Sequence, residues 1–212
     1  MRLFTNPGQE QPGWGDTIYL KNSETLLKFN GGTLHCGGRS GIINDHDAPI
    51  MIDLFRCNFL QGSVAVAWML KLFECQGIFR SCSFVGAGFR DWVNGVLRDG
   101  HPVYLSPTGS VLFESCNFIN NGGNLQFVQR DYGYPHGKTG LPVVDKPPTG
   151  DIELVFKDCT LHNNSWNAAG NGGGGASQLA IYNASEQGTT VRIHDTTITI
   201  IMATIIIRHI NI

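Results

Sequence analysis

One pattern of apolar and polar positions occurs six times along the chain. Its clearest copy is VLFESCNF at residues 111–118. Val111 and Phe113 are the two alternating apolar positions. After a gap of two residues come a small residue, Cys116, and, two positions further, an apolar residue, Phe118. The copies begin at residues 27, 52, 77, 111, 154 and 191, so successive starts lie 25, 25, 34, 43 and 37 residues apart. A period of 25 residues that later lengthens predicts a solenoid whose later turns carry loop insertions.

The gap inside each copy predicts a bend. Alternation of apolar and polar residues is typical of a strand with one buried face. The interruption at Arg56 or Ser81 indicates that the chain turns there while the apolar residues on both sides still point inward. Such bends are typical of parallel β-helices. An antiparallel sheet would instead show two-residue hairpin turns, and no Asn-Gly turn recurs at this period. The copy at residues 77–84 fits the pattern more loosely.

Further strands are predicted between the copies, at residues 17–20, 40–43, 64–70, 101–105, 125–128 and 178–182. Residues 64–70 are apolar on both parities, so a short buried helix is the alternative there. Residues 1–20 predict an N-terminal partial turn that caps the stack, and residues 196–212 predict a C-terminal edge strand. The whole chain, 1–212, is therefore expected to form a single domain.

Composition favours an all-β protein and excludes some partners. The chain contains 27 Gly and 9 Pro, and no other window favours an amphipathic helix. With a net charge of −2 and only 15% charged residues, nucleic acid and anionic membranes are disfavoured as partners. The N-terminal residues lack the order of a signal peptide, and the longest apolar run, 198–207, is too short to span a bilayer. The sequence leaves localisation open.

Four of the six cysteines occupy the small position of the pattern: Cys57, Cys82, Cys116 and Cys159. In a solenoid they would stack about 4.8 Å apart, one in each turn. Parallel Cβ vectors suit a disulfide poorly, and a buried free cysteine behaves as a small apolar residue. We therefore expect a reduced interior ladder, with disulfides as the alternative. A zinc site is disfavoured because no C-x₂-C spacing occurs.

Two features together resemble a known superfamily. Phe-x-x-Cys-x-Phe units recur at residues 79–84 and 113–118, and an Asn-Asn-Gly corner follows at residues 120–122. With variable loops at fixed positions, they resemble the right-handed parallel β-helix proteins of the pectate-lyase-like superfamily, over roughly residues 17–205. The resemblance implies a right-handed single-stranded β-helix of about six to seven turns. That superfamily includes polysaccharide lyases, glycoside hydrolases, epimerases, phage tailspikes and noncatalytic surface proteins.

The first candidate site lies around the corner of the fourth turn. The insertions 85–100 and 162–176 leave the chain at the same corner and would form two walls. Aromatic faces with amides and charges nearby suit sugar rings, and loops on a rigid scaffold often carry function. The predicted binding residues are Arg90, Asp91, Trp92, His162 and Trp166 on the walls, with Asn120 and Asn121 on the floor. The alternative is that the aromatic residues fold their own loops onto the scaffold.

The second candidate site is the insertion at residues 130–150. Polysaccharide lyases of this general fold neutralise a sugar carboxylate with a cation and abstract a proton with a basic group or tyrosine. The resemblance implies Arg130 or Lys138 for the first role, and Tyr134 or His136 for the second. Additional binding residues are predicted at Asp131, Tyr132, Tyr104 and Gln126. Binding without catalysis and an oligomer contact are the alternatives.

The sequence therefore predicts a protein that binds or processes polysaccharides. If it is an enzyme, a polysaccharide lyase or glycoside hydrolase is expected. The alternative is a noncatalytic structural, adhesive or oligomeric module, such as a tailspike-like fragment or a protein encoded on a mobile element. No cofactor is predicted except that residues 44–47 could hold Ca²⁺ through their oxygens, with a solvated turn as the alternative. The Ile-rich C-terminal strand predicts a homodimer, because an uncovered sheet edge tends to pair. The alternative is that residues 202–212 are a disordered or fortuitous extension.

Overall fold

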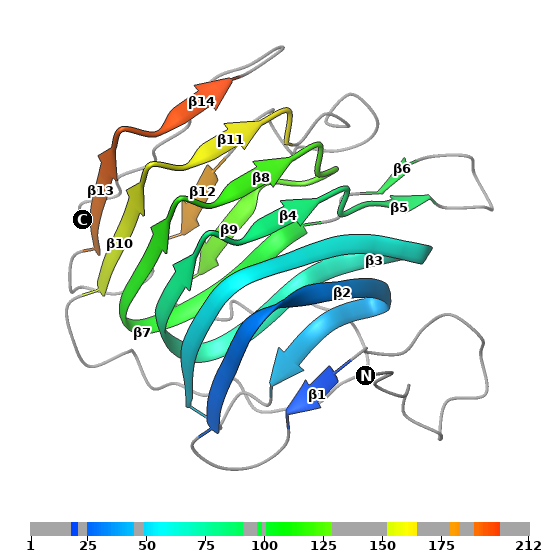
Figure 1. Cartoon of the computed structure of the whole chain (residues 1–212), viewed down its shortest axis with the longest axis horizontal. Coiled ribbons are helices and arrows are strands. Elements are labelled where there is room, and N and C mark those ends of the chain that lie inside the picture. Colours follow the sequence, from blue (N-terminus) through cyan, green and yellow to red (C-terminus); the bar gives the residue numbers. More distant parts are fainter. Residues whose placement is uncertain are drawn as a thin grey trace.

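The computed structural model of the chain describes residues 18–20, 25–44, 49–90, 97–98, 101–128, 152–164, 179–182 and 189–199. These residues form strands and no helix (Figure 1). The strands are β1 (Ile18–Leu20), β2 (Thr25–Asn44), β3 (Ile50–Arg80), β4 (Ser83–Val85), β5 (Phe89–Arg90), β6 (Leu97–Arg98), β7 (His101–Glu114), β8 (Asn117–Ile119), β9 (Leu125–Val128), β10 (Ile152–Lys157), β11 (Thr160–His162), β12 (Leu179–Tyr182), β13 (Thr189–His194) and β14 (Thr197–Thr199). The predicted all-β class is confirmed, and residues 64–70 lie in a strand.

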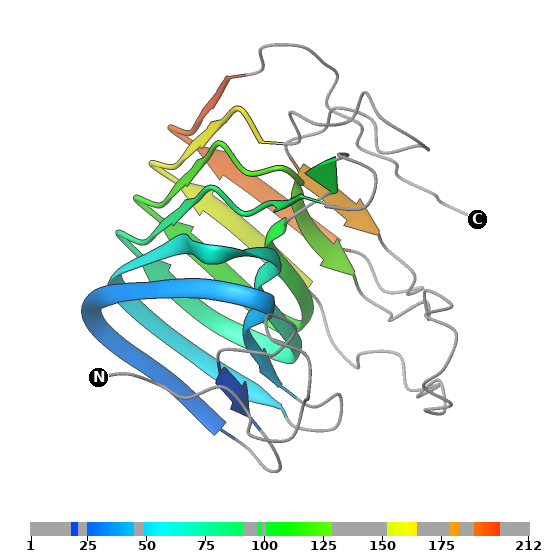
Figure 2. The ribbon, with the colours of Figure 1, turned by 90° about the vertical axis from the view of Figure 1, so that its right-hand side faces the viewer.

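Twelve of the strands form one sheet that curls around a buried interior (Figures 1 and 2). Every strand pair in this sheet is parallel. The exception in the described chain is the pair β5 and β6, which is antiparallel and lies inside the insertion at residues 85–100. The sequence predicted this insertion but not the hairpin within it.

The repeated pattern is a repeat of hydrogen-bonding register. Leu27 pairs with Ile52, the first residues of the first two copies. Gly77 pairs with Val111, which also pairs with Leu154, and Leu154 pairs with Val191. Equivalent residues of successive copies are therefore neighbours across the sheet, which confirms the predicted stacking of the copies.

The predicted bend is also confirmed. Just before the small position of the pattern, a residue other than glycine takes a positive φ in five copies: Arg56 (54°), Ser81 (52°), Ser115 (54°), Asp158 (53°) and Asp195 (45°). The backbone amides at three of these bends donate to a carbonyl of the following copy, at 2.8 Å for Ser81 and 2.9 Å for Ser115. These hydrogen bonds hold a conformation that costs about 1–2 kcal/mol per residue.

The sheet has three faces. The bend separates the first face from the second, and a corner that includes Asn120 and Asn163, which also have positive φ, follows the second face. The first face comprises residues 27–30, 52–55, 77–80, 111–114, 154–157 and 191–194. The second face comprises residues 33–36, 57–60, 83–85, 117–119, 160–162 and 197–199. The third face comprises residues 40–44, 68–73, 101–106, 125–128 and 179–182. All three contribute side chains to one buried apolar cluster.

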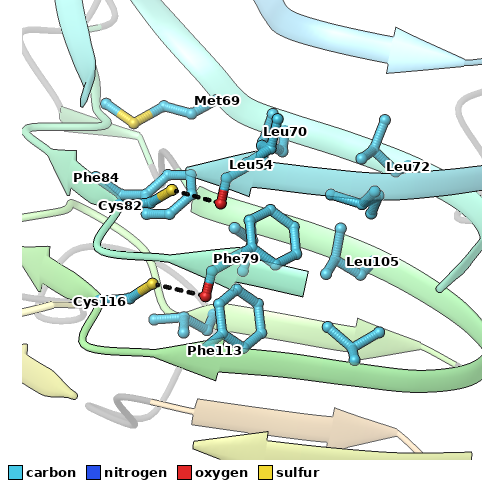
Figure 3. Close-up of a cluster of buried hydrophobic side chains, with 14 of the residues drawn as sticks. Leu54, Met69, Leu70, Leu72, Phe79, Cys82, Phe84, Leu105, Phe113 and Cys116 are labelled. Carbon is cyan, nitrogen blue, oxygen red and sulfur yellow. Dashed lines mark hydrogen bonds between the residues drawn. The ribbon is translucent and has the colours of Figure 1, made fainter. Parts of the chain in front are cut away.

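Two columns of stacked phenylalanines fill much of this cluster, and Figure 3 shows Phe79 and Phe113 of the first column and Phe84 of the second. On the first face, the ring centroids of Phe79 and Phe113 lie 4.5 Å apart, with Phe156 5.1 Å further on. On the second face, Phe84 stacks on Phe59 at 4.7 Å and Phe118 stacks on Phe84 at 4.9 Å. Aromatic pairs contribute about 0.5–1.5 kcal/mol beyond the area they bury. The columns therefore favour the in-register stacking of the copies.

The cysteine ladder lies between these columns, and all six cysteines are free and buried. Each ladder sulfur lies near a carbonyl oxygen of the preceding copy. The Sγ of Cys82 is 3.5 Å from the Leu54 oxygen, and that of Cys116 is 3.4 Å from the Phe79 oxygen (Figure 3). A carbonyl only accepts, so these contacts require a protonated thiol. The predicted reduced interior ladder is confirmed.

Gly77 explains why the copy at residues 77–84 fits the pattern loosely. Its φ is +141°, and a Cβ there would overlap the backbone of Ile52. The register also shifts between Cys75 and Gly77. An apolar side chain at this position is therefore excluded by the backbone of the neighbouring turn.

Replacing Gly77 by Ala should lower the free energy of unfolding by about 3 kcal/mol, because it combines an unfavourable φ with a backbone clash. Gly31→Ala is the matched control, since Gly31 also has a positive φ of 79° but no atom lies within 4 Å of the added Cβ. The control should lose about 1 kcal/mol. Urea denaturation at unchanged m-value measures both. Equal losses would contradict the clash.

Candidate functional site

The outer side of the second face carries a column of small polar side chains. Along each strand, inward residues such as Phe84 and Phe118 alternate with outward ones. We name the outward residues of the first row the polar column: Thr33, Asn58, Ser83, Asn117, Thr160 and Thr197. They pair in this order across β2, β3, β4, β8, β11 and β14, one residue to a strand. Successive members are therefore about 4.8 Å apart.

The polar column keeps its hydrogen-bonding groups available. Among the described residues, the side chains of Asn58, Ser83, Asn117 and Thr160 make no hydrogen bond. Hydroxyl and amide groups each offer both donors and acceptors. The column is thus a regular row of uncharged donors and acceptors that faces outward.

A second row runs beside the polar column, and we name it the aliphatic column. Its members pair in the order His35, Leu60, Val85, Ile119, His162 and Thr199. The three central aliphatic side chains are half-buried. Neither column contains a Lys, Arg, Asp or Glu. The outer side of the second face therefore combines polar and apolar groups without a formal charge.

The first face is charged by comparison. Lys157 Nζ lies 2.7 Å from Glu114 Oε1, and Arg192 Nε lies 2.6 Å from Glu153 Oε1. The hydrogen bond from Lys157 lowers the pKa of Glu114 and raises the pKa of Lys157. These pairs link neighbouring copies at the surface, where ion pairs contribute little to stability. The contrast sets the second face apart as the neutral surface.

The corner that follows the second face contains two stacked pairs of asparagines. Asn121 is 0% exposed, and its Nδ2 donates to Asn164 Oδ1 at 2.7 Å and to Phe84 O at 3.1 Å. Its Oδ1 accepts from the backbone amide of Ala87 at 2.8 Å. Asn164 repeats this arrangement with the Phe118 carbonyl. Asn121 was predicted as a floor residue of a binding site, but its buried and fully bonded amide gives it a structural role.

Asn120 and His162 are placed together, as the first candidate site requires. The Asn120 backbone amide donates to the His162 carbonyl at 3.0 Å. On the outer side, Asn163 Nδ2 donates to Asn120 Oδ1 at 2.9 Å. Of the predicted wall residues, Arg90 lies on β5, while Asp91, Trp92 and Trp166 fall outside the described residues. Their contacts to a ligand stay predictions.

The structure describes two residues of the second candidate site. Tyr104 and Gln126 are direct neighbours on β7 and β9. The proposed catalytic residues, Arg130, Tyr134, His136 and Lys138, lie outside the described residues, as do Asp131 and Tyr132. A catalytic role therefore stays a prediction.

The sequence reasoning missed three residues beside Tyr104. The ammonium of Lys71 lies 4.4 Å from the ring centroid of Trp68, 5.3 Å from that of Tyr104 and 5.4 Å from that of Phe73. Residues 64–70 are apolar on both parities, so the pattern does not show which side chains point outward. The spacing W-x-x-K-x-F at residues 68–73 was the available signal.

Of the predicted calcium corner at residues 44–47, the structure describes Asn44, whose side chain is hydrogen-bonded to the backbone. Asn44 Oδ1 accepts from the Phe73 backbone amide at 2.7 Å, and its Nδ2 donates to the Phe73 carbonyl at 2.9 Å. Residues 45–47 lie outside the described residues, so Ca²⁺ binding stays a prediction. Elsewhere in the described chain, no group of three or more His, Cys, Asp or Glu side chains is placed to hold a metal ion.

The cysteines are poor candidates for a nucleophile. Burial raises the pKa of the Cys36 and Cys75 thiols to about 12. The thiolate is the reactive form, so these thiols are unreactive at neutral pH. In the ladder, burial raises the pKa of the Cys57 thiol, and the carbonyl oxygens of Phe79 and Phe113 accept from the thiols of Cys116 and Cys159.

Comparisons of the chain with protein-family models, curated proteins and solved structures gave no match. In the described part of the chain, no helix has the length and apolar character needed to cross a membrane.

Asn121→Ala should lower the free energy of unfolding by about 3 kcal/mol, because it removes the partner of the buried Ala87 amide and the buried bonds to Asn164 and the Phe84 carbonyl. Asn163→Gly is the control, since glycine tolerates the positive φ of 52° at this position and the change removes only an exposed amide bond, so it should cost about 1 kcal/mol or less. Chemical denaturation measures both. Similar losses would show that the buried ladder is not the stabilising element.

The native protein should show no fast-reacting thiol with a thiol-specific chromogenic reagent at pH 8, and all six should react after unfolding. Stability should also fall above the ordinary thiol pKa of 9.0. Cys36 and Cys75 keep their protons to about pH 12 when folded, whereas the unfolded chain loses them from about pH 9. A rapidly labelled native cysteine would contradict this burial.

Proposed function

We propose that this protein is a polysaccharide-binding β-helix. The finer fold is part of the proposal: a right-handed single-stranded parallel β-helix of about six to seven turns. The in-register pairing of Leu27 with Ile52 and of Val111 with Leu154 supports it, as does the recurrent bend. A stack of this kind presents every outward position as a straight row, which suits a long and repetitive ligand.

The observation that carries the proposal is the neutral outer side of the second face. A sugar chain has hydroxyl groups along its edges and C–H groups on its ring faces. The polar column offers unpartnered hydroxyls and amides to the edges, and the half-buried side chains of Leu60, Val85 and Ile119 offer an apolar strip to the ring faces. The absence of formal charge from both columns favours an uncharged polysaccharide.

The position of the insertions adds to this argument. The chain enters the 85–100 insertion directly from β4, and the residues that follow Asn164 leave from the same corner. Both insertions therefore attach at one edge of the second face, next to Asn120 and His162. Trp92 and Trp166 in these insertions are the side chains that would enclose a sugar bound at this edge.

Cleavage of the ligand is a separate proposal. It rests on the residues of the second candidate site, of which Tyr104 and Gln126 lie together on the third face.

The homodimer through residues 196–212 likewise stays a proposal. Within the described chain, Val191 and Ile193 are 37% and 44% exposed on β13, although they continue the buried positions of Leu154 and Phe156. A second copy that covers this end would bury them.

Binding can be tested by affinity electrophoresis of the full chain through gels that contain xylan, glucomannan or mixed-linkage β-glucan, with polygalacturonate as the acidic comparison. We expect retardation by at least one neutral polymer. The variant Ser83→Lys/Asn117→Lys should lower the affinity about tenfold, because it places two charges and long side chains in the polar column.

Ser110→Lys is the matched control. It makes the same type of substitution on β7, directly before the first face and beside Glu153, and should leave binding unchanged. Thermal unfolding of each variant checks that the fold is retained. If no polymer retards the protein, or if the double variant and the control bind equally, the proposal is wrong. Retardation by polygalacturonate alone would also contradict a neutral ligand.

A further inference from the structure

Three aromatic rings surround one ammonium group on the third face. Lys71 Nζ lies 4.4 Å from the ring centroid of Trp68, 5.3 Å from that of Tyr104 and 5.4 Å from that of Phe73. A cation within about 6 Å of a ring centroid is attracted by the negative face of the ring. One such contact is expected about once in 70–80 residues, so three on one ammonium are a built arrangement.

The backbone fixes the positions of these rings. Lys71 and Tyr104 are paired neighbours on β3 and β7. Phe73 packs edge-on against Tyr104, with ring centroids 6.1 Å apart and an interplanar angle of 66°. Phe73 is only 3% exposed, and both its backbone groups are hydrogen-bonded to the Asn44 side chain. The ring of Phe73 is thus a fixed inner wall, while Trp68 and Tyr104 are half-buried outer walls.

We propose that Trp68, Phe73 and Tyr104 form an aromatic cage for a methylated ammonium ligand, and that the side chain of Lys71 occupies this cage in the free protein. Aromatic rings grouped around a cation recognise quaternary ammonium groups. The cage lies on the third face, whereas the proposed polysaccharide surface lies on the second face. The two proposals therefore stand or fall separately.

Lys71 acts as an internal competitor for the cage. Its primary ammonium is compact, strongly hydrated and carried on a flexible four-carbon stem. When it leaves the cage, it regains its hydration. A quaternary ammonium gains less from water, because it has no N–H donors, and it fills the space between the rings with methyl groups. The ligand therefore displaces a group of the same charge, and the cage stays occupied by a cation in both states.

The test is a titration of the full chain with tetramethylammonium and with choline. Binding is measured by calorimetry and by NMR of the indole N–H signals. Lys71→Ala should bind both cations at least tenfold more tightly than the original chain, because the competitor is gone. Lys71→Met should bind more weakly than Lys71→Ala, because its stem still fills the cage. Adding Trp68→Ala to Lys71→Ala should lower the affinity at least tenfold.

A neutral analogue separates cation binding from simple apolar binding. 3,3-Dimethylbutanol has the shape of choline without its charge, and it should bind Lys71→Ala at least tenfold more weakly than choline does. Thermal unfolding confirms that each variant is folded. The proposal is overturned if folded Lys71→Ala binds neither cation, if the neutral analogue binds equally well, or if Trp68→Ala has no effect.

Discussion

The in-register parallel pairing of successive copies is the constraint on which the rest of this structure depends. Because Val111 pairs with both Gly77 and Leu154, every position of one copy lies beside the same position of the next. Inward positions then stack like on like, which gives the phenylalanine columns and the cysteine ladder. A shift of one residue would move the whole apolar set to the outside. Packing and hydrogen bonding therefore favour the same register.

The same constraint produces both surface features. Outward positions also stack like on like. Small polar residues such as Ser83 and Asn117 therefore lie side by side in a row although they are far apart in the sequence. At the corner, the register brings Asn121 beside Asn164 and allows a buried amide to bond its equivalent in the next turn. On the third face it brings Lys71 beside Tyr104. Register converts scattered residues into arrays.

The sequence predicted the features that repeat and missed those that arise between turns. The buried position of Cys116 and the bend at Ser81 could be predicted because the pattern recurs. Equivalent positions of a stacked repeat become neighbours across the sheet. The role of Asn121 was missed, although Asn121 and Asn164 each lie ten residues after the start of their copies at residues 111 and 154, which makes their two corners equivalent. The cage around Lys71 depends on the pairing of two strands that share no motif. The hairpin of β5 and β6 was also missed, although the sequence between the two strands contains Asn94-Gly95, a dipeptide that marks short hairpins.

The hydrogen bonds at the bends have a direction along the chain. The amide of Ser81 donates forward to Glu114, and that of Ser115 donates forward to Lys157, whereas the amide of Asn117 donates back to Cys82. Each turn thus needs acceptors from a turn that follows it. During synthesis on the ribosome, a bend acquires its last partner only after the next copy has emerged. A turn therefore completes the hydrogen bonds of its bend only when the copy that follows it lies beside it.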